Sequence, residues 1–144
     1  MNQIIKNSIT VILSAFLISF NAFAGTGDLR HSTAAKEIAE LRTYVENAGS
    51  SNAEAYANAA QICINRGYNL QEAKAWIEHA IQLNSSPQNL EILGDYHYRT
   101  GKIADAYKAF NKALNLTFDH QVSEDEMARL QLKIQTTAKD LLNK

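Results

Sequence analysis

The chain has 144 residues, of which 20% are charged, and its formal net charge is −1. This length is enough for one domain. A near-neutral balance of charge gives no electrostatic basis for binding nucleic acid or an anionic membrane surface. Cys63 is the only cysteine, which excludes an internal disulfide, so core packing must stabilise the fold.

The first 24 residues are typical of a secretory signal peptide. Lys6 precedes an apolar run over residues 9–20, and the sequence Ala22-Phe23-Ala24 provides a small-x-small cleavage site. The alternative is a membrane anchor, which needs about 20 apolar residues. The run here is shorter and is interrupted by serine and asparagine.

We therefore divide the chain into a signal peptide at 1–24, a flexible lead at 25–31 and a folded domain at 32–144. Cleavage would leave no membrane span, and we expect the mature protein in the periplasm or outside the cell.

Apolar residues recur at helical spacing through the folded part and predict an all-α domain of about six helices. The expected ranges are 33–48, 52–66, 70–83, 87–100, 103–115 and 123–142. Several starts carry capping residues, namely Ser51 with Glu54, Ser86 before Pro87, and Ser123 with Glu126.

Two stretches of the chain repeat. The residues Tyr56, Ala59, Ala60 and Cys63 recur 34 positions later as Leu90, Leu93, Gly94 and His97. The residues Ala73, Ile77, Ala80, Ile81 and Leu83 recur 33 positions later as Ala106, Phe110, Ala113, Leu114 and Leu116. Small residues at these positions let helix backbones approach closely, while the large residues fill the gaps.

Over residues 52–117 this pattern resembles the tetratricopeptide repeat family. The second repeat matches well, with Leu90, Leu93-Gly94, Tyr98, Ala106, Phe110 and Ala113. The first is degenerate, because Ala59-Ala60 replaces Leu-Gly and Cys63 stands at the aromatic position. The resemblance implies an α-α superhelix of two repeats, flanked by capping helices at 33–48 and 123–142.

The resemblance also implies a concave groove lined by the first helix of each pair. Carried onto this sequence, the groove residues are Gln61, Ile64, Asn65, Glu91, Asp95, Tyr98 and Arg99. Tyrosine and arginine are favoured at binding hot spots. An alternative is that Asp95 and Arg99, four apart on one helix, pair with each other in solvent. A partly exposed edge of Trp76 is the next candidate for a binding surface.

The sequence carries no recognisable catalytic, cofactor-binding or metal-binding motif. None of the four histidines has the spacing of a helical zinc site. Cys63 falls at a helix-packing position, where a buried thiol is usually inert. We therefore predict no catalytic, cofactor or metal residues.

These observations predict a non-enzymatic, exported protein–protein interaction module that binds a protein or peptide partner in its groove, with no small-molecule substrate evident. A structural or self-associating component of an envelope complex is the alternative, followed by an enzyme of a type that lacks local motifs. Fold alone does not establish function, and the sequence leaves the oligomeric state open.

Overall fold

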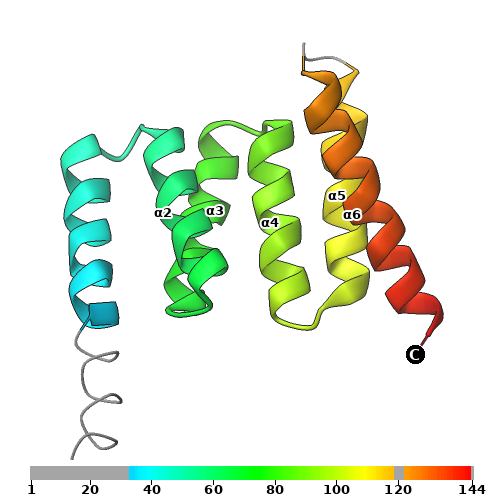
Figure 1. Ribbon diagram of the computed structural model, residues 1–144. Helices are drawn as coiled ribbons and strands as arrows, with labels where there is room; N and C mark the ends of the chain where they lie inside the picture. The colour runs from blue at the N-terminus through cyan, green and yellow to red at the C-terminus, as the bar shows by residue number, and fades with distance from the viewer. Residues whose placement is uncertain (1–32, 119–121, 144) are drawn as a thin grey trace, which may run out of the picture. The chain divides into compact units, whose positions relative to one another are not determined.

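The computed structural model describes residues 33–118 and 122–143, and this part of the chain is helical with no strand (Figure 1). The predicted signal peptide and lead lie outside the described residues. Residues 33–48 are helical and are followed by α2 (Ala53–Arg66), α3 (Leu70–Leu83), α4 (Pro87–Arg99), α5 (Ile103–Thr117) and α6 (Glu124–Leu142). The predicted all-α fold of about six helices is confirmed. The chain divides into two units after Ala39, and the second, Glu40–Lys144, holds the core.

Local capping explains where most of these helices begin. The Ser86 hydroxyl accepts a hydrogen bond from the Asn89 N–H at 3.1 Å, and Pro87 occupies the first turn of α4. Ser123 and Glu126 form the reciprocal capping box predicted for α6. The prediction that Ser51 caps α2 is wrong. Asn52 caps this helix instead, and its side-chain oxygen accepts a hydrogen bond from the Ala55 N–H at 3.1 Å. The sequence alone does not distinguish the two residues, because asparagine and serine are equally good caps and stand next to each other in the chain.

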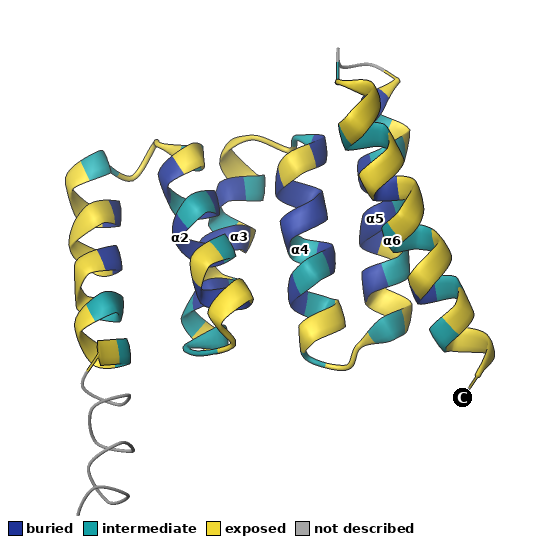
Figure 2. Cartoon of the chain, viewed as in Figure 1, coloured by how far each residue is buried: buried dark blue, intermediate teal, exposed yellow. Residues whose placement is uncertain are grey.

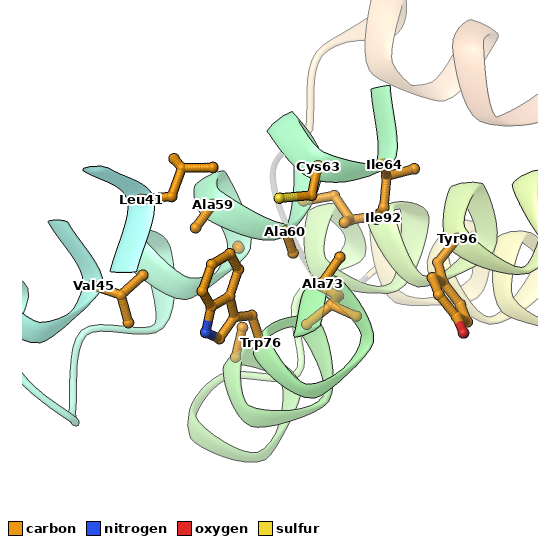
Figure 3. Close-up of a cluster of buried hydrophobic side chains, with 13 residues drawn as sticks. Leu41, Val45, Ala59, Ala60, Cys63, Ile64, Ala73, Trp76, Ile92 and Tyr96 are labelled. Carbon is orange, nitrogen blue, oxygen red and sulfur yellow. The ribbon is translucent and has the colours of Figure 1, made fainter. Parts of the chain in front are cut away.

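Two helix pairs, α2 with α3 and α4 with α5, make the most extensive contacts in the described structure, and α6 packs against α5. Figure 3 shows the first core cluster, in which Cys63 and Trp76 are buried together with residues of α4. The expectation that Trp76 has a partly exposed edge is wrong, since the residue is only 8% exposed. Leu41 and Val45, from the helix that precedes α2, belong to the same cluster and supply its cover.

A second cluster joins α4, α5 and α6 through Leu90, Ala106, Phe110, Ala113 and Leu130. Here α4 and α5 approach so closely that a Cβ placed on Gly94 would collide with the Phe110 ring. Glycine at this position is therefore required by packing. Its φ is not positive, so no backbone conformation demands it.

Gly94→Ala tests this contact, because two effects oppose each other there. Alanine is a better helix former than glycine by about 1 kcal/mol, but overpacking a tight core costs about 1–3 kcal/mol. We expect the clash to dominate and Gly94→Ala to lower the free energy of unfolding, measured by urea denaturation.

The control is a double-mutant cycle with Phe110→Ala, which alone should cost about 3–5 kcal/mol. The penalty of Gly94→Ala should shrink or reverse once the ring is gone. Strictly additive effects would show that the two residues are not in contact.

Candidate functional site

A run of three hollows follows α2, α4 and α6, and we call it the groove. The first, of about 350 Å³, is lined by the N-terminal turns of the three helices, and the second, of about 290 Å³, by their middles. The third, of about 310 Å³, lies between the C-terminal parts of α4 and α6. Gln88 lines the first and second hollows, and Asp95 lines the second and third, so neighbouring hollows share walls. The three helices therefore run in the same direction along one groove.

The structure brings most of the predicted groove residues together. Gln61, Asn65, Glu91 and Asp95 line the second hollow, while Tyr98 lines the third together with Asp95. The Gln61 amide N–H donates to Asn65 Oδ1 at 3.0 Å. Gln61 and Asn65 belong to α2, and Glu91, Asp95 and Tyr98 belong to α4. The contact between α2 and α4 places the two sets side by side.

Two of the predicted residues line none of the three hollows: Ile64 is buried, and Arg99 lies at the C-terminal end of α4, one turn beyond Asp95. Ile64 is only 3% exposed and belongs to the first core cluster with Ile92, so it is not available to a partner. The prediction fails because a position beside a packing residue still faces the neighbouring helix α4. The Arg99 side chain is exposed and lies against Gly67, the residue that ends α2 in a left-handed turn.

Ion pairs between α4 and α6 form the floor of the groove. Arg129 donates two hydrogen bonds to the Glu91 carboxylate, from Nε at 2.8 Å and from Nη2 at 2.9 Å. The Lys133 ammonium contacts Glu91 Oε1 at 2.8 Å and both oxygens of Asp95, at 2.6 and 2.7 Å. Asp95 therefore pairs across to α6, contrary to the alternative in which it pairs with Arg99.

Arg129 and Lys133 are groove residues that the sequence reasoning missed. They lie four positions apart on α6, the same spacing as Glu91 and Asp95 on α4. Residues four apart share one face of a helix, so this matched spacing of opposite charges was a signal that α6 lies against α4.

The two carboxyl groups respond differently to their surroundings. Burial raises the pKa of Glu91, but hydrogen bonds from Arg129 and Lys133, together with their charges, outweigh it and bring the pKa below its usual value. Burial raises the pKa of Asp95 as well, and the neighbouring Glu91 charge adds to this, so its pKa stays raised despite the bond to Lys133. Glu91 is thus the firmly ionised member of the pair.

The third hollow is more apolar than the other two. Its walls include Tyr98, Phe110 and Leu132, and the two outer side chains are well exposed, Tyr98 at 41% and Leu132 at 64%. The Tyr98 hydroxyl donates to Asp140 Oδ2 at 2.8 Å, which fixes the ring at the end of α6. An exposed apolar surface beside fixed polar groups is suited to contact with another molecule.

His97 lies on the opposite side of α4, near α5. Its Nδ1 is buried and, within the described structure, has no hydrogen-bond partner. Burial lowers the pKa of the ring, an effect that the charges of Lys102 and Lys74 reinforce and that Asp105 and Glu78 oppose. This placement agrees with the packing position expected from the repeat.

Glu91→Gln tests the ion pairs that hold α6 to α4. The Glu91 side chain is only 7% exposed, and a hydrogen bond to a charged group contributes about 1.5–3 kcal/mol. We expect a loss of that size in the free energy of unfolding at pH 7. The matched control is Glu78→Gln, which removes an exposed pair with Lys74 and should cost less than about 0.5 kcal/mol. Equal effects of the two variants would contradict the role given to Glu91.

The lowered pKa of His97 predicts that the stability of the protein depends on pH on the acid side of neutrality. An unfolded histidine has a pKa near 6.5 and takes up its proton before folded His97 does, because the folded pKa is lowered. The contribution of His97 to stability is therefore complete well above this value and is lost as pH falls through it towards the lower pKa of folded His97. The Glu91 contribution is lost separately, as pH falls below about 4.5.

Urea denaturation at a series of pH values measures this slope, and His97→Phe should flatten it between pH 7 and 5. A slope unchanged by His97→Phe would assign the dependence to other groups.

No metal-binding cluster of three His, Cys, Asp or Glu side chains occurs in residues 33–118 and 122–143. Within the same ranges, none of the helices combines the length and the apolar character that crossing a bilayer requires. Comparison with protein-family models, with curated proteins and with solved structures finds no match to this chain.

Proposed function

We propose that this protein is a non-enzymatic interaction module of the tetratricopeptide-like kind, which holds a segment of a partner protein in the groove. The observation that carries the proposal is the continuity of the three hollows along parallel helices. A groove of this form offers one uninterrupted surface to an extended chain. The repeat pattern of small and aromatic residues supports the same assignment.

The side chains of the middle hollow are suited to holding a polypeptide backbone. Gln61, Asn65 and Gln88 are amides, each able to donate and accept hydrogen bonds, and all three line this hollow. Arg129 uses Nε and Nη2 for Glu91, and its side chain remains 49% exposed. These groups match the alternating N–H and C=O groups of an extended segment.

The site of action that we propose is the periplasm or the extracellular space. Support for export comes from the sequence of residues 1–24, whose charge, apolar run and cleavage site follow the pattern of a secretory signal.

Self-association by end-to-end stacking has less support. In α6 the buried residues are Leu130 and Thr137, and most of this helix is drawn as intermediate or exposed in Figure 2. The exposed residues of α6 include Gln131, Gln135 and Lys139, and its large exposed apolar residues are Leu132, which borders the groove, with Leu141 and Leu142 at the C-terminal end of the helix. The polar residues cover the middle of the outer face, as expected for a terminal helix of a repeat array, whereas a stacking surface would be apolar along its length.

Gln88→Trp provides the sharpest test, because Gln88 is exposed and lines both the first and the second hollow. A tryptophan there should fill the groove with little effect on stability. We expect the wild-type protein to retain a partner from envelope extract in a pull-down, and Gln88→Trp to lose most of it.

The matched control is Gln82→Trp, the same change at an exposed position of α3 that lines none of these three hollows. Capture should be unaffected in this variant, and both variants should show wild-type helical content by circular dichroism. Undiminished capture by folded Gln88→Trp would move the binding surface away from the groove.

A further inference from the structure

Charged side chains are distributed unevenly along the groove. Glu54 and Glu126 line the first hollow, and the first turn of α6 adds Glu124 and Asp125. At the opposite end, the last helical turns carry basic residues: Arg66 on α2, Arg99 on α4 and Lys139 on α6. Asp140, which accepts a hydrogen bond from the Tyr98 hydroxyl, also lies at this end, so three cations stand beside one carboxylate there. The groove is therefore acidic at one end and has a net positive charge at the other.

The parallel course of the three helices explains this order. Acidic residues stabilise the first turn of a helix and basic residues stabilise the last turn, because of the helix dipole. In helices that alternate in direction these charges would cancel across the surface. Here α2, α4 and α6 run the same way, so the acidic first turns of α2 and α6 gather at one end of the groove and the basic last turns of all three helices at the other.

The charges in the middle of the groove cancel and so do not change the difference in charge between its two ends. Glu91 and Asp95 carry two negative charges, and Arg129 and Lys133, which pair with them, carry two positive charges. The field that a partner meets therefore comes from the two ends. The pKa of Glu126 is lowered by hydrogen bonds from the backbone and side chain of Ser123, so the acidic end remains charged at neutral pH.

The apolar hollow lies near the basic end. Tyr98, the exposed residue of its α4 wall, directly precedes Arg99 in the chain. On α6, Lys139 follows Leu132 by seven residues and so lies on the same helix face. A large apolar side chain in this hollow would thus be adjacent to the cations.

The length of the groove sets the length of its occupant. From Glu54 to Arg66 the helix rises by about 18 Å, at 1.5 Å per residue. An extended segment advances about 3.3 Å per residue, so five or six residues span the distance between the acidic and basic ends.

We infer that the occupant is an extended segment of a partner protein with basic residues at one end, acidic residues at the other, and a large apolar residue next to the acidic end. This inference rests on the proposed function and specifies the chemistry of the same groove. The basic end of the segment contacts Glu54 and Glu126, its apolar side chain enters the hollow between Tyr98 and Leu132, and its acidic end contacts Arg99 and Lys139.

Two synthetic peptides of identical composition separate this order from simple charge attraction. In the first, Lys-Lys-Ser-Ser-Leu-Asp-Asp, the leucine is next to the acidic end, and in the second, Lys-Lys-Leu-Ser-Ser-Asp-Asp, it is next to the basic end. Each is titrated into the isotopically labelled full chain, and binding is followed by NMR chemical shifts. We expect the first peptide to bind at least about fivefold more tightly, because burying a leucine side chain is worth more than that factor.

Variants of the protein assign the effect to its residues. Arg99→Glu should weaken the first peptide by about tenfold, and Leu132→Ala should remove the preference between the peptides. The control Lys112→Glu changes an exposed charge of the same sign on α5 and should leave both affinities unchanged.

The possible results distinguish this inference from the proposed function. Equal affinities, with shifts mapping to the groove, would overturn the inferred order of charges and leave the groove as a binding site. Absence of peptide binding, with partner capture still abolished by Gln88→Trp, would also overturn it. Shifts confined to residues outside the groove, together with undiminished capture by Gln88→Trp, would overturn both.

Discussion

The groove depends on one buried carboxylate, Glu91. Burial alone would favour its neutral form, and it stays ionised because Arg129 and Lys133 of α6 hydrogen-bond to it. An ionised carboxylate in this position is tolerated only while it is paired. The pairing therefore ties α6 to α4, and it is α6 that supplies the third wall of the groove.

The rest of the core makes that arrangement possible. Gly94 lets the Phe110 ring lie against the backbone of α4, and Leu130 of α6 joins the same cluster. Buried apolar residues of α6 are few, since Leu130 and Thr137 are the buried members of this helix. Polar contacts add to its attachment, namely the ion pairs of Arg129 and Lys133 with α4 and the Tyr98–Asp140 hydrogen bond.

The sequence was sufficient for the number of helices and for most of their bounds. Helical periodicity and strong signals such as Ser86-Pro87 and the Ser123–Glu126 capping box are local, and local rules decide them. The choice between Ser51 and Asn52 was not decided locally, because the two residues cap with similar strength. The repeated pattern of small and large residues also identified Phe110 and Cys63 as packing positions, and both are buried.

Contacts between helices were predicted less well. Ile64 was assigned to the groove from its position within the repeat, but the neighbouring α4 covers it. Trp76 was expected near the surface, yet Leu41 and Val45 share its cluster. Both errors arise because periodicity defines one face of a helix and does not say which neighbour covers the rest. The matched four-residue spacing of charges on α4 and α6 shows that a complementary pattern on two helices can supply part of this information.

The central claim is that a partner polypeptide lies along the groove, and crosslinking inside the cell tests it most directly. A photoreactive amino acid placed at Gln61, in the middle of the groove, should crosslink the protein to another polypeptide when irradiated in living cells. The same residue placed at Glu78, on the exposed surface of α3, should not. Crosslinks that form at Glu78 and not at Gln61, or that join two copies of this chain through Gln61, would contradict the account.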